Sequence, residues 1–187
     1  MCGITGIFTH KEEAQDYLTH VINAVAAMHH RGSDNKGFYT GTHAALGHAR
    51  LSIIDTSDAS AQPFYSADKR YVLVYNGEFF NYKAHQEALQ KKGISFRTSG
   101  DTEVLLQLYI TQGEGFLENV NGFFAIAIYD TQENSLFLAR DRYGIKPLFY
   151  HIDNGKLIFA SELRALLKYP VERKLDLTSL VEYLQLN

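Results

Sequence analysis

The chain has 187 residues, of which 45% are hydrophobic, and its 18 basic and 21 acidic residues leave a formal charge of −3. This balance suits one globular domain with a substantial core, and it makes nucleic acid and anionic membranes poor candidates for partners. No apolar run approaches the roughly 20 residues that span a bilayer, and MCGITGIFTH lacks the basic leader of a secretory signal. Cys2 is the only cysteine, so no intramolecular disulfide can form, and the expected location is the reducing cytoplasm.

The first half of the chain predicts strands and helices in alternation. Residues 3–8 predict a short buried strand and residues 18–29 an amphipathic helix. Strand-like runs follow over 44–55, with a break expected near 48–50. The β-rich segment YVLVY then leads directly into Asn76-Gly77.

Next, the sequence predicts a polar helix over 82–92, capped by Gly93, and a short strand at 94–96. A second helix is expected to start at Asp101, which is a candidate N-cap, and to end near Gly113.

The second half predicts two antiparallel hairpins, one around 131–134 and one around Asn154-Gly155. Their four strands are apolar at nearly every residue, so we expect both faces of each strand to be covered. The class is therefore α+β, with antiparallel sheets sandwiched between layers. A last amphipathic helix near 177–184 either docks on this core or faces a domain outside the chain.

Cys2 is the first candidate for chemistry. If Met1 is removed, Cys2 carries both a thiol and an α-amine, whose pKa of about 7.7–8.0 lets it take the thiol proton near neutral pH. In isolation, a small apolar residue at the start of a buried strand would be the better interpretation of this cysteine.

Six motifs occur in order along the chain and change that interpretation: MCGITGIF, HHRGSDN, GHARLSIID, NGEFFNY, SGDTEVLL and RDRYGIKPLFY. Together they resemble the N-terminal glutaminase domain of glutamine-hydrolysing asparagine synthetase, a class II glutamine amidotransferase. The resemblance covers the whole chain. It implies a four-layer αββα N-terminal-nucleophile (Ntn) hydrolase fold with two stacked antiparallel sheets, and Cys2 as the nucleophile.

The resemblance also implies an oxyanion hole. Asn76 would supply its side-chain amide and Gly77 its backbone N–H to the oxyanion that forms when the thiolate attacks a carboxamide. The same dipeptide is a strong signal for a tight hairpin turn. Because the following segment predicts a helix rather than a paired strand, we prefer the catalytic interpretation.

Free glutamine carries two charges that a selective site should pair. The planar guanidinium of Arg50 suits the α-carboxylate, and by resemblance Asp101 binds the α-ammonium. The resemblance further implies that the glutamine pocket is lined by Leu51, Ile53, Ile54, Gly77 and Glu78. The adjacent His29 and His30 lack the usual spacing of zinc ligands, so no metal site is expected, and a structural or pocket-shaping loop is preferred for this motif.

The expected reaction is hydrolysis of L-glutamine to glutamate and ammonia through a thioester, without a metal or organic cofactor. By resemblance, ammonia would pass to a C-terminal synthetase domain that uses ATP and magnesium to activate aspartate. The Ser-Gly-Gly loop of that domain is absent from residues 1–187, so we expect a fragment. Two alternatives stay open: a glutaminase domain serving another acceptor, and a non-catalytic glutamine-binding or assembly domain. The oligomeric state is also open, a homodimer included.

Overall fold

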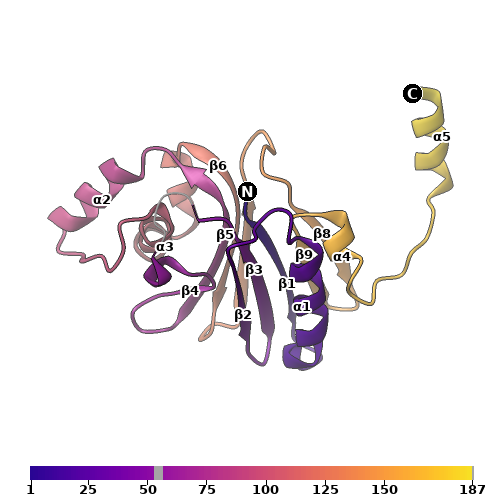
Figure 1. Cartoon of the computed structure of the whole chain (residues 1–187), viewed down its shortest axis with the longest axis horizontal. Helices are drawn as coiled ribbons and strands as arrows, with labels where there is room; N and C mark the ends of the chain where they lie inside the picture. Colours follow the sequence, from indigo (N-terminus) through magenta and orange to yellow (C-terminus); the bar gives the residue numbers. More distant parts are fainter. Residues whose placement is uncertain (53–56, 187) are drawn as a thin grey trace.

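The computed structural model describes residues 1–52 and 57–186, and their strands form two sheets (Figure 1). The first sheet has the order β2-β3-β1-β9-β8, with bounds Asn35–Thr40, Ala44–Arg50, Gly3–Thr9, Lys156–Ala160 and Phe149–Asp153. The second has the order β4-β5-β6-β7, with bounds Phe64–Tyr65, Tyr71–Phe79, Gly122–Asp130 and Ser135–Arg140. Each neighbouring pair of strands is antiparallel, as predicted.

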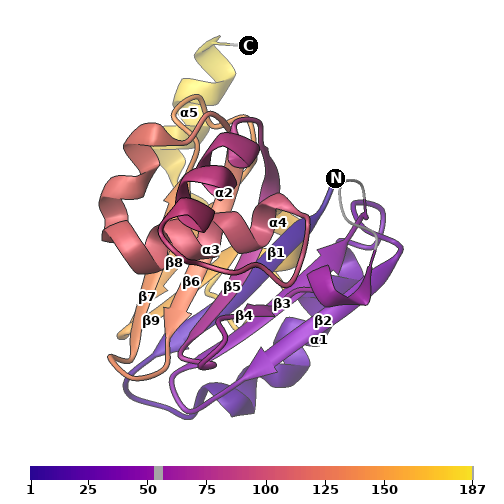
Figure 2. The same ribbon diagram turned by 90° about the vertical axis from the view of Figure 1, so that its left-hand side faces the viewer.

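Helices cover the outer faces of both sheets (Figures 1 and 2). On the first sheet lie α1 (Leu18–Ala27) and the short α4 (Leu163–Leu166). On the second lie α2 (Tyr82–Lys91) and α3 (Asp101–Gln112). Three 3₁₀ segments complete the body: η1 (Ala14–Tyr17), η2 (Asp58–Ser60) and η3 (Gly113–Asn119). The layers are therefore helix, sheet, sheet and helix, which confirms the predicted αββα class.

Alternation along the strands divides the apolar residues among three cores. In β5, Leu73 and Tyr75 face α3, while Val72 and Val74 join the core between the two sheets. A third core lies between α1 and the first sheet, where Val25 is fully buried. The central strands β3, β5 and β6 thus bury both faces, which is why they are apolar or small at most positions.

Two predictions about strands in the first half were wrong. Residues 94–96 form no strand: the N–H of Ile94 donates to the Leu89 carbonyl of α2 at 3.1 Å, and the N–H groups that follow, those of Arg97 and Thr98, donate to the side chain of Glu103. The expected break near residues 48–50 is also absent. β3 runs unbroken to Arg50, and its polar residues find partners between the sheets.

In the second half, the strands differ in how well they are covered. β6 is buried along most of its length, as expected. β8 is an edge strand, and Tyr150 and Ile152 are 65% and 64% exposed, so the expectation of two covered faces was wrong there. The last helix, α5 (Leu177–Leu186), stands apart from the sandwich, and none of its ten residues is buried (Figure 1).

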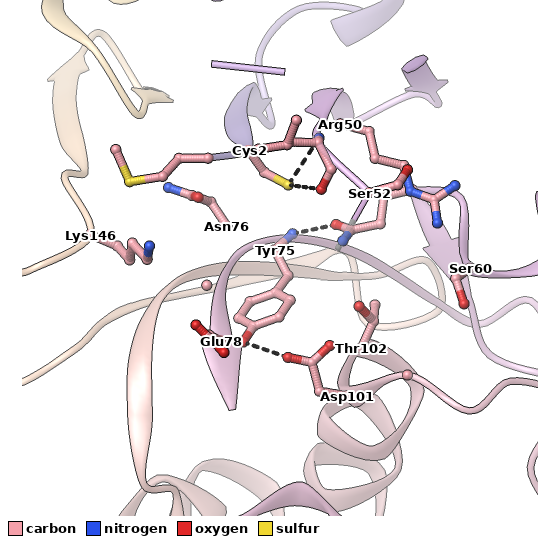
Figure 3. Close-up of a pocket in the computed structure, with 15 residues that line it drawn as sticks. Cys2, Arg50, Ser52, Ser60, Tyr75, Asn76, Glu78, Asp101, Thr102 and Lys146 are labelled. Atoms are coloured by element: carbon pink, nitrogen blue, oxygen red, sulfur yellow. Dashed lines mark hydrogen bonds between the residues drawn. The ribbon is translucent and has the colours of Figure 1, made fainter. Parts of the chain in front are cut away.

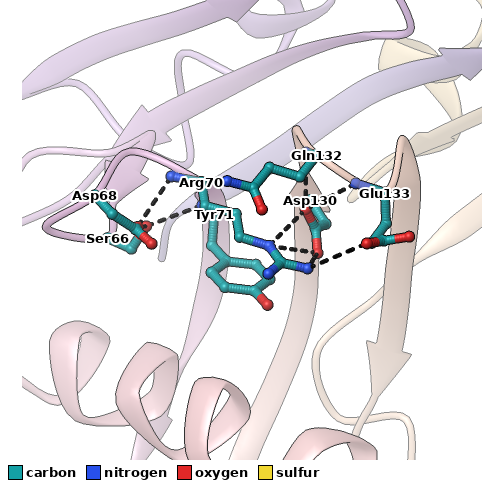
Figure 4. A network of polar contacts seen from close by, with 7 residues as sticks. All are labelled: Ser66, Asp68, Arg70, Tyr71, Asp130, Gln132 and Glu133. Carbon is teal, nitrogen blue, oxygen red and sulfur yellow. Dashed lines mark hydrogen bonds and ion pairs between the residues drawn. The ribbon is translucent and has the colours of Figure 1, made fainter.

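The end of β5 near Tyr71 is held by a polar network (Figure 4). Arg70 lies directly before this strand, and its Nη2 is 2.7 Å from Oδ2 of Asp130, while its Nε donates to both carboxylate oxygens at 3.0 Å. Asp130 also accepts from the backbone N–H groups of Gln132 and Glu133, in the turn that joins β6 to β7. The predicted turn at 131–134 is therefore fixed to the neighbouring strand by charge.

Candidate active site

A pocket of about 710 Å³, open solvent at its mouth included, lies where the two sheets meet α3 (Figure 3). Cys2 reaches it from just before β1 and Arg50 from the end of β3. Asn76 and Gly77 reach it from β5, and Asp101 from the first residue of α3. Cys2 and Asp101, which are 99 positions apart in the sequence, therefore line one cavity.

Strand register explains why these side chains converge. Gly3 pairs with Ala49, so Cys2 comes to lie beside Arg50. Side chains alternate across a strand, and Ile4 and Val74 both belong to the core between the sheets. By this two-residue period, Cys2 and Asn76 also project into the space between the sheets.

The thiol of Cys2 lies against the backbone of Leu51. Its Sγ accepts from the Leu51 N–H at 3.4 Å and is 3.5 Å from the Leu51 carbonyl oxygen. Burial raises the pKa of the Cys2 thiol, outweighing the opposite influence of the hydrogen bond to Leu51 and of the Arg50 charge. The sulfur is therefore largely protonated near neutral pH and needs a base to become a nucleophile.

The main chain of Cys2 is anchored by a cluster behind the pocket. Arg31 Nε donates to the Cys2 carbonyl oxygen at 2.9 Å, and Arg31 Nη1 lies 3.1 Å from Glu162. Glu162 also lies 2.8 Å from His30 and 2.6 Å from Arg164. Burial alone would raise the pKa of Glu162, but these three partners lower it to about 2. The HHRG motif thus anchors the main chain of Cys2 through Arg31, in agreement with the expected structural loop.

The edge of β5 is open where β4 ends, and side chains take the place of a partner strand. Gln62 Oε1 accepts from the N–H of Tyr75 at 2.6 Å, and His48 Nε2 donates to the Tyr75 carbonyl at 3.2 Å. Four residues further, the N–H of Phe79 donates to Asp101 at 3.1 Å. Successive residues of a strand point their N–H groups to alternate edges. The N–H of Gly77, two residues after Tyr75, therefore lies on this same edge. A Cβ at Gly77 would come within 2.4 Å of the Phe123 carbonyl, so no side chain fits there.

The side chain of Asn76 projects from the face of β5 opposite to that of Tyr75, into the space between the sheets, and is 1% exposed. Its Nδ2 is buried and has no hydrogen-bond partner among residues 1–52 and 57–186. Asn76 and Gly77 pair with Ala125 and Phe124 inside a continuous strand, so they do not form a hairpin turn. The choice against the turn is confirmed, and an amide donor is held unsatisfied beside Cys2 (Figure 3).

The two charged residues expected to bind glutamine are both buried at this pocket. Arg50 is 6% exposed, and both of its terminal nitrogens donate to the Ser57 carbonyl at 3.1 Å. Asp101 Oδ2 accepts from the Tyr75 hydroxyl at 3.1 Å. Burial raises the pKa of Asp101 despite this hydrogen bond and the one from Phe79. Gly100, and not Asp101, occupies the N-cap position of α3, so the N-cap prediction was wrong.

Leu51 and Glu78 also line the pocket, whereas Ile53 and Ile54 lie outside the described residues. Several pocket residues were missed by sequence reasoning, among them Ser60, Gln62, Tyr75 and Lys146. His48 does not line the pocket but bonds to the Tyr75 carbonyl, and it could have been found, because it lies two positions before Arg50 and so shares its strand face. Gln62 and Ser60 carried no such signal, since they come from a loop and a 3₁₀ turn.

The described charged groups near the pocket do not assemble a metal site. Within residues 1–52 and 57–186, no group of three or more His, Cys, Asp or Glu side chains could hold a metal ion. The same part of the chain contains no helix long and apolar enough to cross a membrane.

Comparison with known proteins matches the whole chain, residues 1–187, to the glutamine amidotransferase domain family. Asparagine synthetase B (glutamine-hydrolysing) of Escherichia coli is 40% identical over 89% of this chain and 30% of its own length. Asparagine synthetase 2 (glutamine-hydrolysing) of Bacillus subtilis is 38% identical over 91% of the chain and 23% of its own length. The chain therefore spans less than a third of these relatives.

Among solved structures, glutamine phosphoribosylpyrophosphate amidotransferase from B. subtilis superposes with a TM-score of 0.71. The alignment covers 88% of this chain and 42% of that chain, at 25% sequence identity. Fold, family match and relatives agree with one another. The chain belongs to the glutamine amidotransferase domain family and is homologous to the N-terminal glutaminase part of glutamine-hydrolysing asparagine synthetases.

Proposed function

We propose that this chain is a single glutaminase domain that hydrolyses L-glutamine to glutamate and ammonia with Cys2 as nucleophile. One observation carries the proposal: a half-buried thiol and an unsatisfied amide donor, Asn76, lie together at one pocket whose walls also hold a buried cation and a buried carboxylate. That arrangement matches a zwitterion with a carboxamide at the far end of its side chain.

The thiol must first lose its proton. Because burial raises its pKa, the proton needs an acceptor, and the α-amine of Cys2 would serve once Met1 is removed. As long as Met1 is attached, the nitrogen of Cys2 belongs to a peptide amide and is not basic. Arg31, through its hydrogen bond to the Cys2 carbonyl, would keep the residue in place after cleavage.

Attack then forms a bond between Sγ and the amide carbon of glutamine. The negative charge that develops on the carbonyl oxygen would be bound by Asn76 Nδ2 and the Gly77 N–H. Each such donor is typically worth about 3–4 kcal/mol of barrier. The α-ammonium returns its proton to the leaving nitrogen, the C–N bond breaks, and ammonia departs. Water then adds to the thioester, the C–S bond breaks, and glutamate and the thiol are released.

For substrate binding we propose that Arg50 pairs with the α-carboxylate of glutamine and Asp101 with its α-ammonium. Leu51 and Glu78 also line the pocket and would contact the substrate, and Ile53 and Ile54 stay predicted contacts. Arg50 is held in place by the Ser57 carbonyl, and Asp101 by Tyr75 and Phe79, so both charges are pre-positioned.

We further propose that ammonia serves a synthetase domain that converts aspartate to asparagine. The support is the similarity to asparagine synthetases, of which this chain covers 23–30%. In such a domain ATP and magnesium would supply the activation, and no residue of this chain is assigned to them. A free thiol nucleophile favours the reducing cytoplasm as the place of action.

The test is ammonia release from glutamine by the chain with Met1 removed, checked by intact mass. Cys2→Ala should lower the rate by roughly 10⁴-fold or more while leaving thermal unfolding unchanged. The glutamine analogue 6-diazo-5-oxo-L-norleucine should add one label, at Cys2. Unchanged activity in Cys2→Ala would refute the mechanism. Glutamine binding without any turnover by the processed chain would favour a non-catalytic glutamine-binding domain instead.

A further inference from the structure

Four buried side-chain polar atoms in the described part of the chain have no hydrogen-bond partner, and two of them line the pocket. One is Asn76 Nδ2, next to Cys2. The other is Oγ of Ser60, in the 3₁₀ turn η2, and Ser60 is 7% exposed. Leaving a buried hydroxyl unsatisfied costs about 1–3 kcal/mol. Such a group in a cavity is suited to a ligand that satisfies it.

Hydrogen bonds place Ser60 next to Arg50. The carbonyl oxygen of Ser57 accepts from the Ser60 N–H at 3.2 Å and from both terminal nitrogens of Arg50 at 3.1 Å. A serine and a guanidinium that share one acceptor atom are close neighbours. Figure 3 shows Ser60 below the Arg50 guanidinium, on the side of the pocket away from Asn76.

The two unsatisfied atoms therefore mark two ends of one ligand. Asn76 lies at the Cys2 end, where the carboxamide oxygen of glutamine would lie. Ser60 lies at the Arg50 end, where the α-carboxylate would lie. A hydroxyl can donate one hydrogen bond, and a carboxylate accepts at two oxygens, so the carboxylate can be shared between Arg50 and Ser60.

We propose that Ser60 is a specificity-determining residue whose hydroxyl donates to the α-carboxylate of the substrate. This inference rests on the proposed glutaminase function. It assigns to Ser60 the recognition of α-carboxylate compounds over amides that lack this group. Hydrogen bonds to charged groups are worth more than neutral ones, so its loss should weaken substrate use about tenfold or more.

The test compares three amides as substrates of the processed chain, with ammonia release as the readout of kcat/KM. Glutaramate lacks the α-ammonium of glutamine, and 4-aminobutanamide lacks its α-carboxylate. Ser60→Ala should lower kcat/KM about tenfold for glutamine and glutaramate, with kcat for glutamine retained and KM raised. It should leave kcat/KM for 4-aminobutanamide unchanged. Stability should be unchanged or slightly higher, because the deleted oxygen has no partner within the described residues.

Ser161→Ala is the matched control. Ser161 is also a buried serine, but its Oγ accepts from the Ile4 N–H at 3.0 Å and does not line the pocket. This variant should lower stability and leave the ratios of kcat/KM among the three amides as they were. A purely structural effect of losing a buried serine would appear in both variants.

Equal kcat/KM for glutamine in Ser60→Ala and the parent chain would overturn the inference, as would an equal loss with 4-aminobutanamide. Failure of the proposed function looks different. In that case the parent chain releases no ammonia, and its Cys2→Ala variant shows no glutamine binding by calorimetry. If that Cys2→Ala variant binds glutamine, adding Ser60→Ala should weaken the binding about tenfold, whether or not the parent chain turns over.

Discussion

The two ends of strand β5 differ in whether the polar groups near them are paired. At the Tyr71 end, the charges of Arg70 and Asp130 are paired with each other and with neighbouring groups (Figure 4). At the Asn76 end, Nδ2 of Asn76 and the hydroxyl of nearby Ser60 are buried without hydrogen-bond partners in the described part of the chain. The first arrangement stabilises the fold. The second holds polar atoms ready for a ligand, at some expense of stability.

After Cys2→Ala, the largest effect is expected from removing the unsatisfied amide donor of Asn76. Asn76→Ala is expected to lower kcat for glutamine by roughly 10²–10³-fold, because one proposed oxyanion donor is lost. Stability should be unchanged or slightly higher, since the deleted nitrogen has no partner to lose. Steady-state kinetics and thermal unfolding check both parts. A kcat within twofold of the parent chain would remove Asn76 from the mechanism.

A second variant removes the charge of Asp101 and nearly keeps the shape of its side chain. Asp101→Asn should lower kcat/KM for glutamine roughly 10- to 100-fold, because the substrate ammonium loses its buried partner. Glutaramate, which has no ammonium, should be little affected. An equal loss for both amides would contradict the assignment.

The pH dependence of substrate binding follows from the same residue. In the proposed binding mode the ammonium pairs with ionised Asp101, and burial raises the pKa of this group. The affinity for glutamine should therefore fall, as the pH is lowered, at a higher pH than an ordinary aspartate would give. The affinity for glutaramate should not follow this profile, which calorimetry in the Cys2→Ala background can measure.

The Tyr71 end should show the reverse behaviour. Asp130→Asn is expected to lower the free energy of unfolding by about 1–3 kcal/mol, because Arg70 loses its charged partner. Kinetic constants for glutamine should be unchanged. Denaturant unfolding monitored beside the ammonia assay tests this, and a selective loss of kcat would contradict the division between the two ends.

Asp130 also predicts how that difference depends on pH. Burial would raise its pKa, but the hydrogen bonds from Arg70 and the turn lower it overall. Its contribution is therefore fully present above the unfolded value of about 4 and is lost as the pH falls through the folded value. The gap in stability between the parent chain and Asp130→Asn should close below about pH 4. There Asp130 is protonated and, like the asparagine of the variant, carries no charge.

The smallest effect is expected at the rim of this network. Glu133 lies 3.8 Å from Arg70 and its side chain is 73% exposed, so water screens the pair. Glu133→Gln should change the free energy of unfolding by less than about 0.5 kcal/mol. A loss as large as that of Asp130→Asn would mean that the network acts as one unit and not mainly through Asp130.

The sequence by itself determined the class and most elements, because apolar periodicity and turn residues act locally, whereas the four-layer αββα arrangement was predicted from the resemblance of the six motifs. Both hairpins and the helices of 18–27, 82–91 and 101–112 lie where the pattern predicted them. The prediction failed where exposure depends on which other elements cover a strand. The apolar residues of β8 give no sign that this strand lies at the edge of its sheet. It also failed at 94–96, where the N–H of Ile94 donates to the carbonyl of Leu89 in the preceding helix.

At the pocket, residue type and motif order were enough to select Cys2, Asn76, Arg50 and Asp101 as candidates. Only the tertiary structure brought them to one cavity, through the register of β1 on β3 and the two-residue alternation of β5. It alone revealed the partners that no local pattern encodes: Gln62 and His48 on the open edge of β5, and Ser60 beside Arg50. A hydrogen-bond partner is a property of a position in space, and local sequence patterns record only positions along the chain.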